Sequence, residues 1–477
     1  MEIDNQYPMK TFVTLTLILL MNNSIGQILF NNTYHKLDWD YADAVLERQD
    51  GKYLVAGSSR SNLLTDYDVN ILLIDSAGNT IWDKYLGIPD TLEFAYSLIA
   101  TSDNNYLISG RIGNYYPYMM KFDSSGTIVW EKRYDSNGFC TGGYSIGETA
   151  DSNYFFVRPD YSFYSTTLFK TTMQGDTIWT KSYDSLTCFS AIITNDNGFA
   201  LIGNYNFMTI QDIKLVKTDS NGDTMWTKLY GGIGYDDATS IQQLPDNGYI
   251  IAGSYDGLVI DDENDTYIIR TNPNGDTLWT KRYYHMGVPV HIKECAYSSG
   301  YILSTTRYVQ NAFPNPDEQY ISILKLDTLG NLQWSRHFDG GIYAIGNNVT
   351  QTSDGGFLLS GSINNSLNLA DMILIKLDSI GNFVLSINDN QNQNSTIAFA
   401  FPNPAVDNIN FQLISGIGIQ IKQLKILNIM GQEMKIVNDI NTVKIQINLD
   451  LFSTGFYIYQ LTATDNSVLT GKFIVKK

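Results

Sequence analysis

Four acidic residues within five positions form the densest group of candidate metal ligands in this chain. They are Asp261, Asp262, Glu263 and Asp265, on a loop between two expected strands. Carboxylate oxygens are the ligands that calcium prefers, so calcium is the one candidate ion here. A solvated acidic loop without an ion has the same composition, and we favour that interpretation. We therefore predict no cofactor.

Two further segments resemble oxygen-rich calcium loops, at residues 219–223 and 272–276. Asp, Asn and Gly also supply the local hydrogen bonds and the positive φ of a hairpin turn. The full twelve-residue calcium-loop pattern is absent, and the acids vary between copies of the segment. These segments are expected to be turns.

A set of residues at one repeated position is the second candidate site. Each of them lies ten positions before an aromatic residue that recurs along the chain: Asp43, Tyr96, Tyr144, His291 and Asn347, with Phe189 and Thr239 at the same place. If the repeats pack around an axis, the set forms a layer of aromatic and polar groups near that axis, as in many ligand sites. A packed or water-filled centre without a ligand is the alternative, and residue types alone favour it.

Residues with catalytic chemistry do not form a recognisable pattern. The sequence has no Gly-x-Ser-x-Gly elbow, phosphate loop or His-Glu-x-x-His. Asp236 and Asp237 are adjacent on an expected strand and point to opposite faces, so a role in capping a loop is favoured over paired catalysis. Cys140 and Cys188 fall in equivalent loops, where free core thiols are favoured over a disulfide.

The elements that position these residues repeat. A Gly precedes a Trp by four residues six times, and a seventh copy has Leu in place of Trp: Gly78/Trp82, Gly126/Trp130, Gly175/Trp179, Gly222/Trp226, Gly275/Trp279, Gly330/Trp334 and Gly381/Leu385. A second landmark is a turn followed by a short apolar strand, which begins with an aromatic residue: Tyr53, Tyr106, Tyr154, Phe199, Tyr249, Tyr301 and Phe357. Such regular recurrence is typical of a repeat fold.

Each repeat contains four strand-like segments, for example 238–243, 249–255, 266–271 and 277–283. One four-stranded sheet cannot bury both of its faces, so the sheets must stack around an axis. The chain is therefore predicted to be all-β, with a seven-bladed β-propeller over residues 27–390. Small residues suit the crowded inner strands, and Trp suits the outer strands, where the gap between blades is widest.

Two stretches compete to close the ring, residues 28–37 and residues 382–388. The loss of Trp from the seventh copy favours the N-terminal stretch as the closing strand.

The two ends of the chain differ from the repeats. A basic residue, an apolar run over 12–21 and small residues before Gln27 predict a cleaved secretory signal over residues 1–26. That run is too short to span a bilayer comfortably, and no other segment is predicted to be transmembrane. A linker at 391–396 precedes residues 397–477, where alternating apolar residues predict a small immunoglobulin-like β-sandwich.

The net charge of −18 disfavours nucleic acid as a partner, because an acidic surface repels phosphates. From residue 397 onward there are five Asp or Glu and seven Lys, a net of +2, which leaves −20 for the preceding part. This asymmetry supports two regions of separate origin.

The last 80 or so residues carry an ordered set of motifs: Pro402, Asn403 and Pro404 after Phe401, then Gly455 and Tyr457, then Lys472 and Lys476. They resemble the type A C-terminal sorting domain of the Bacteroidota type IX secretion system, with Phe401 where that family usually has Tyr. The resemblance implies export by the type IX machinery, cleavage of the domain, and release from or attachment to the cell surface.

The repeats resemble quinoprotein-like and tryptophan-docking propellers through Gly-Asp-Thr-Ile-Trp and its variants, a fold-level likeness that implies no cofactor. The favoured function is a secreted or surface propeller that binds glycans or proteins without catalysis, because seven sets of loops on a rigid frame suit binding. Two alternatives remain open. One is an extracellular carbohydrate-active or quinone-dependent enzyme, and the other is a structural surface component.

Overall fold

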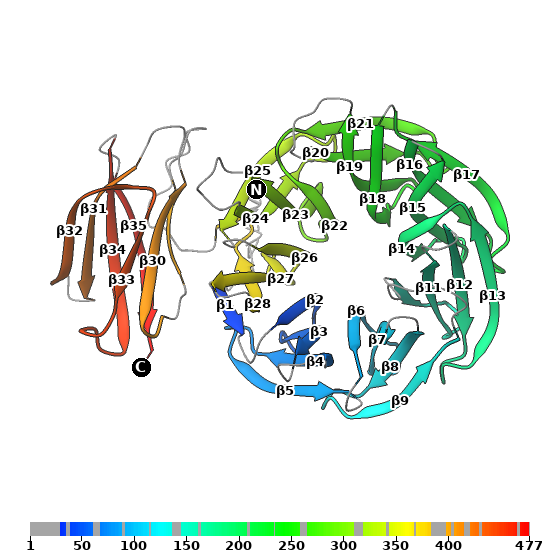
Figure 1. Cartoon of the computed structure of the whole chain (residues 1–477), viewed down its shortest axis with the longest axis horizontal. Helices are drawn as coiled ribbons and strands as arrows, with labels where there is room; N and C mark the ends of the chain where they lie inside the picture. The colour runs from blue at the N-terminus through cyan, green and yellow to red at the C-terminus, as the bar shows by residue number, and fades with distance from the viewer. Residues whose placement is uncertain are drawn as a thin grey trace, which may run out of the picture.

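The computed structural model contains two all-β units (Figure 1). It describes residues 29–34, 39–60, 67–87, 91–113, 116–135, 145–160, 164–207, 210–232, 234–257, 265–309, 318–339, 343–366, 369–382, 397–401, 405–414, 420–428, 432–464 and 468–476. These residues contain strands and turns, and no helix among them is long and apolar enough to cross a membrane.

The first unit is a ring of four-stranded antiparallel groups, each running outward from the axis (Figure 1). The first three groups are β2 (Asp40–Glu47), β3 (Tyr53–Arg60), β4 (Tyr67–Ile74) and β5 (Thr80–Leu86); β6 (Glu93–Ala100), β7 (Tyr106–Ile112), β8 (Tyr116–Phe122) and β9 (Ile128–Arg133); and β10 (Ile146–Glu148), β11 (Tyr154–Asp160), β12 (Ser165–Thr171) and β13 (Thr177–Asp184).

Further round the ring, two groups share one eight-stranded sheet through a single parallel bridge between Gln211 and Tyr235. They are β14 (Thr187–Ile193), β15 (Phe199–Phe207), β16 (Ile210–Thr218) and β17 (Thr224–Tyr230), then β18 (Gly234–Gln243), β19 (Tyr249–Gly257), β20 (Asp265–Thr271) and β21 (Thr277–Tyr283). The next group is β22 (Val288–Glu294), β23 (Tyr301–Val309), β24 (Glu318–Leu326) and β25 (Leu332–Asp339).

The N-terminal strand completes the ring. The last group consists of β26 (Ala344–Gln351), β27 (Phe357–Ser366), β28 (Leu369–Leu377) and β1 (Phe30–Tyr34). β1 pairs antiparallel with β28 from Phe30↔Lys376 to Tyr34↔Met372, so it occupies the outermost position. The two ends of the repeat region are thereby joined in one sheet, as the loss of Trp from the seventh copy predicts. The sheet topology confirms the β-propeller fold.

Neighbouring groups are joined at the periphery by one repeated contact. The outer-strand Trp or Phe lies over the Gly of the next group's hairpin turn, as with Trp226 over Gly275 and Phe30 over Gly78. A tyrosine four residues after the Trp or Phe, on the same face of the outer strand, donates its hydroxyl to the carbonyl of the same glycine. The distance from Tyr230 Oη to the Gly275 oxygen is 2.7 Å. We call these contacts the outer girdle.

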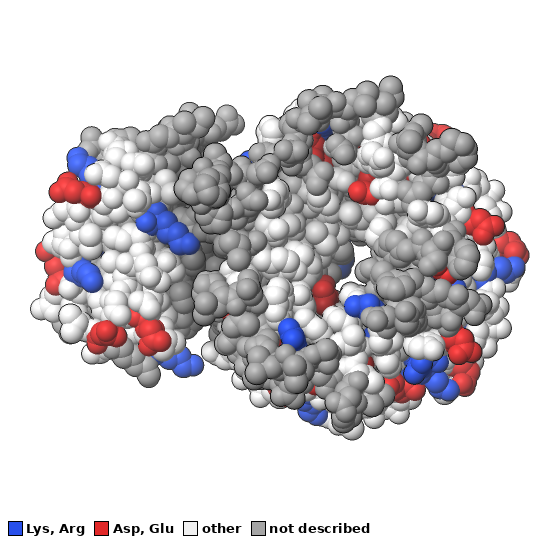
Figure 2. Space-filling view, in the orientation of Figure 1, with Lys and Arg blue, Asp and Glu red and all other residues white. Residues whose placement is uncertain are grey.

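Ion pairs reinforce the outer girdle. Lys132, Lys181 and Lys228 each reach an aspartate of the next turn, at 2.6, 2.6 and 2.7 Å. Figure 2 shows basic and acidic side chains together along this edge of the ring. The indoles are half-buried and lie on the outer strands between adjacent groups, as the sequence predicts.

The turns beneath the indoles need glycine for two reasons. Gly275 has φ +77°, and a Cβ built on it would lie 2.8 Å from both Trp226 and Lys228. Asn272 closes the same turn by accepting hydrogen bonds from the backbone N–H groups of Asn274 and Asp276, each at 2.9 Å. Asp219 does the same in the preceding group. The predicted hairpin turns are confirmed.

The second unit has two sheets around one core. One sheet holds β29 (Ile397–Phe401), β30 (Asn408–Ile414) and β33 (Lys444–Asn448); the other holds β31 (Ile421–Asn428), β32 (Glu433–Thr442), β34 (Gly455–Ala463) and β35 (Val468–Val475). Phe411 of the first sheet contacts Tyr459 and Phe473 of the second, with ring centroids 5.0 and 5.6 Å apart. Aromatic residues thus join the two sheets, as in a β-sandwich.

Replacing Gly275 by Ala should lower the stability of the propeller more than replacing Gly51 by Ala. Both glycines have positive φ, +77° and +73°, so each substitution carries a similar backbone cost. Only Gly275 is also covered by a neighbouring group, which adds an overpacking cost of about 1–3 kcal/mol. Differential scanning calorimetry of the two variants measures the difference.

Gly51 is the matched control because nothing lies within 4 Å of its built Cβ. A Trp226→Ala change placed on top of Gly275→Ala should relieve part of the cost, since the clashing indole is gone. Equal melting temperatures for the two glycine variants would contradict the girdle contact.

Candidate functional site

The inner strands share an irregularity that creates the candidate site. In six of them the pairing with the second strand skips one residue. For example, Ala42 pairs with Gly57 and Ala44 with Ala56, so that Asp43 is left without an opposite residue. Such a β-bulge turns the extra side chain away from the regular pleat. The extra residues are Asp43, Tyr96, Phe189, Thr239, Val290 and Asn347.

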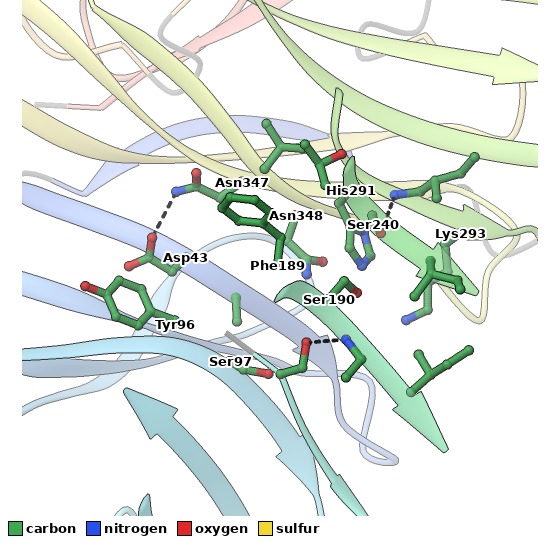
Figure 3. Close-up of a pocket in the computed structure, with 18 of the residues that line it drawn as sticks. Asp43, Tyr96, Ser97, Phe189, Ser190, Ser240, His291, Lys293, Asn347 and Asn348 are labelled. Carbon is green, nitrogen blue, oxygen red and sulfur yellow. Dashed lines mark hydrogen bonds between the residues drawn. The ribbon is translucent and has the colours of Figure 1, made fainter. Parts of the chain in front are cut away.

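These residues line a cavity on the axis with a volume of about 630 Å³. Figure 2 shows the ring hollowed at its centre, and Figure 3 shows Asp43, Tyr96, Phe189 and Asn347 around the cavity. The repeated position that the sequence singled out therefore does converge in space. Tyr144 lies outside the described residues.

The sixth group departs from the predicted alignment. Its extra residue is Val290, whereas counting back ten positions from Tyr301 selects His291. The cause is the turn between its first two strands: Glu294 pairs with Tyr301 seven positions later, whereas Gln243 pairs with Tyr249 six positions later. His291 lines the cavity all the same, one residue further along the strand.

His291 occupies a position that joins neighbouring groups. In two other groups the equivalent residue is a serine: Ser145 accepts from the backbone N–H of Ala191 at 2.9 Å, and Ser240 from that of Ile292 at 3.2 Å. His291 instead places Nδ1 3.1 Å from the carbonyl oxygen of Val349. A carbonyl only accepts, so Nδ1 carries the hydrogen and Nε2 is an acceptor.

Burial, together with the charge of Lys293, lowers the pKa of His291 to about 3, although the hydrogen bond to Val349 opposes this shift. The imidazole is therefore neutral at neutral pH.

Asp43 lies across the cavity and is held by a neighbouring group. Asn347 Nδ2 donates to the carbonyl of Ala42 at 3.1 Å and to Asp43 Oδ1 at 3.3 Å. Burial raises the pKa of Asp43 to about 7. The carboxyl thus changes charge near neutral pH, which is unusual for an aspartate.

Lys293 is the basic residue of the cavity wall. Its side chain is exposed toward the cavity, which opens at the centre of the ring (Figure 2). Desolvation by the surrounding inner strands lowers the pKa of Lys293. Among the described residues no carboxylate forms an ion pair with it. β22 lies across the channel from β2 and β6 in Figure 1, so the lysine and Asp43 are on different sides of the cavity.

An aromatic row that sequence reasoning missed leads away from the cavity. Tyr96 stacks on Phe94 with ring centroids 6.2 Å apart. Phe94 and Tyr67, and then Tyr67 and Tyr41, form tilted ring contacts with centroids 4.9 and 6.3 Å apart. Arg111 lies over the Phe94 ring at 4.3 Å. The signal in the sequence was the run of aromatics at alternate positions of two inner strands, which periodicity alone assigns to the core.

The predicted calcium loop is described only at Asp265. This residue is buried and accepts from Arg282 Nε at 2.6 Å and from the backbone N–H of His285 at 2.8 Å. Its charge is therefore compensated within the protein. Asp261, Asp262 and Glu263 lie outside the described residues. No cluster of three metal-ligating side chains occurs in the part of the chain that the structure describes.

The adjacent acids Asp236 and Asp237 have separate structural roles. Asp236 Oδ2 accepts from the backbone N–H of Gly232 at 2.9 Å, which caps the loop as predicted. Asp237 accepts from Asn204 at 2.5 Å and also from Gln211. Cys188 is a buried free thiol with its pKa raised to about 12 by burial. Cys140 lies outside the described residues.

The predicted sorting residues of the second unit shape its β-sandwich. Tyr457 is buried, stacks on Phe473 and donates its hydroxyl to the Ser453 carbonyl at 2.9 Å. Gly455 and Lys472 lie in β34 and β35, and the backbone N–H of Lys476 donates to the Ala405 carbonyl at 2.8 Å. Pro402, Asn403 and Pro404 lie outside the described residues.

Comparison with known families gives one match. Residues 399–476 match the family model described as the secretion system C-terminal sorting domain. This match indicates export by type IX secretion to the cell surface or the extracellular space. Searches among curated proteins give no match.

Several solved structures are similar to this chain at low identity. Sqt1 from Chaetomium thermophilum is 11% identical, with 73% of this chain and 99% of that chain covered and a TM-score of 0.46. Drosophila Semaphorin 2a is 8% identical, with 94% and 97% covered and a TM-score of 0.46. Puromycin hydrolase is 10% identical, with 78% and 58% covered and a TM-score of 0.46. The propeller assignment rests on the sheet topology described above.

Asp43 should make the propeller less stable as pH rises from about 4 to about 7. The folded state retains the Asp43 proton over this range because its pKa is about 7, whereas the unfolded chain loses it near the ordinary value of 3.8. Relative to Asp43→Asn, the wild-type protein should lose about 2 kcal/mol between pH 5 and pH 8. Chemical denaturation of both proteins at each pH measures this difference.

His291 acts in the opposite direction, because its lowered pKa costs stability as pH falls below about 6.5. Both proteins contain His291, so its contribution cancels in the comparison. A carboxyl resonance of Asp43 that titrates near pH 4 by NMR would refute the assignment.

Proposed function

We propose that this protein is a cell-surface or extracellular binding protein whose axial cavity holds a saccharide or a similarly polar ligand. The observation that carries the proposal is the convergence of bulged residues from separate inner strands on one cavity. A bulge adds a side chain without lengthening the strand, and bulges are concentrated next to binding and active sites. The cavity also falls in the range of about 300–1,000 Å³ typical of ligand pockets.

The lining suits a ligand with both a ring face and hydroxyl groups. Tyr96 and Phe189 offer aromatic surface, while Asp43, Asn347 and Asn348 offer carboxyl and amide groups. Sugars present apolar C–H faces and many hydroxyl groups, and these side chains complement both. Binding without hydrolysis is favoured because Asp43 is the one carboxylate among the described lining residues, and glycoside hydrolysis usually needs two.

A second candidate is a lyase or other proton-transfer enzyme that uses Asp43. Its pKa of about 7 suits a general acid or base at neutral pH. Chromatography of each ligand after incubation with the protein distinguishes this candidate, since only an enzyme changes the ligand.

Binding should depend on the cavity aromatics. A glycan array identifies ligands of the purified full chain, and calorimetry then compares wild type with Tyr96→Ala. Loss of stacking on the Tyr96 ring should weaken binding by about tenfold, or about 1.4 kcal/mol. Tyr284→Ala is the matched control, because Tyr284 is 61% exposed and does not line the cavity. An array without any ligand, or equal losses in both variants, would count against the proposal.

Export should depend on the second unit. A chain that lacks residues 397–477 should remain inside the cell envelope of a bacterium with a type IX system, since the segment that matches the sorting family is missing. Fractionation and immunoblotting locate the protein. As the converse test, a periplasmic reporter fused to residues 397–477 should reach the cell surface or the medium. Normal export of the truncated chain would refute the role.

A further inference from the structure

We infer that the cavity selects an anionic saccharide, whose carboxylate or sulfate group binds to Lys293. This inference rests on the proposed function and names the class of ligand. Lys293, which is exposed toward the cavity, contrasts with the buried basic side chains of the propeller.

Five basic residues on the third strands are matched by aspartates of the adjoining turns, and a sixth, Lys325, donates to the backbone carbonyls of Ser299 and Leu326. Lys121 lies 2.6 Å from Asp103, Lys170 lies 2.8 Å from Asp151, and Lys217 lies 2.7 Å from Asp196. Lys376 and Arg270 pair with aspartates in the same way. An enclosed charge is costly unless it is paired, so this pattern is expected of a stable fold.

Lys293 differs from these residues because it lies on an inner strand and its side chain is exposed toward the cavity. Its ammonium group faces the cavity, and no described carboxylate lies within ion-pair distance of it, although the chain has 49 acidic residues for 31 basic ones. A lysine that faces a cavity of ligand size without a carboxylate partner, in a protein with this excess of acids, suits a partner that arrives from outside. The missing partner is an anion.

Gln242 supplies further donors on the neighbouring strand. It lies three residues after the bulge of β18, as Lys293 does in β22, and both line the cavity. Gln242 Oε1 accepts from the backbone N–H of Glu294 at 2.6 Å. Its amide nitrogen therefore keeps two hydrogens for a ligand. The ammonium and the amide together suit the oxygens of a carboxylate or a sulfate.

The remaining groups suit a sugar ring that carries the anion. His291 Nε2 is an acceptor for a hydroxyl group because Nδ1 donates to Val349. Asp43, Asn347 and Tyr96 lie on the other side of the cavity (Figure 3). The ligand thus meets a cation at one end, and hydrogen-bonding and aromatic groups at the other.

Calorimetry with three disaccharides of equal length tests the inference on the full chain. One carries a uronate, one carries a sulfate ester and one is neutral. At least one of the acidic sugars should bind tenfold more tightly than the neutral one, and the tighter of the two identifies the anionic group. Lys293→Gln should reduce this preference to less than threefold while neutral-sugar binding persists. Lys281→Gln should keep the preference, because Lys281 lies on the outer strand β21 and donates to Asn331 Oδ1 of the next turn at 3.3 Å, away from the cavity.

A second measurement separates ligand binding from a structural role of Lys293. Lys293→Met removes an unpaired charge from the cavity, so its melting temperature without ligand should equal or exceed that of the wild type. A clear fall would reveal a structural partner and overturn the inference. Equal binding of all three sugars would overturn it and leave the proposed function standing, whereas failure of every sugar to bind would overturn both.

Discussion

The structure depends on contact between neighbouring four-stranded groups at the outer edge of the ring. A single group leaves two faces to cover, and each is covered only by the next group. The aromatic ring of one outer strand lies on the glycine of the following turn, and a tyrosine hydroxyl fixes the distance through that glycine's carbonyl. At the ring's closure β1 repeats the contact with Phe30, Asn32 and Tyr34 on Gly78. The girdle therefore runs without a break across the two ends of the repeat region.

Such a rigid frame explains how the centre can remain open. Because the groups are held together at the periphery, the inner strands need not pack against each other across the axis. Each inner strand can then contain a bulge, whose extra side chain enters the cavity instead of the sheet. Stability and ligand contact are thus assigned to different parts of the same sheet. The fold can tolerate Lys293 without a carboxylate partner and Asp43 with one long hydrogen bond because the outer girdle supplies stability at the periphery.

The second unit is the part of the chain that directs its export. Its two sheets are joined by their own aromatic core, so it is a separate structural unit with its own family match. Export to the cell surface or beyond brings the propeller into contact with extracellular polymers. Anionic saccharides occur among such polymers. The net negative charge of the chain disfavours their binding, whereas Lys293 supplies a positive charge within the cavity.

The sequence by itself determined the propeller, the turns, the closing strand and the sorting domain, because each has a local signature repeated at a regular spacing or in a fixed order. It also selected most of the cavity layer by counting back from a recurring aromatic residue. Counting failed in the sixth group, where a turn longer by one residue moved the bulge from His291 to Val290. Only the tertiary structure decided the pairing of charges. Lys121 and Lys293 are alike as residue types, but strand register brings Asp103 to one and leaves the other facing a cavity. Such pairing depends on the register between the turn and the third strand of a group, which residue types alone do not specify.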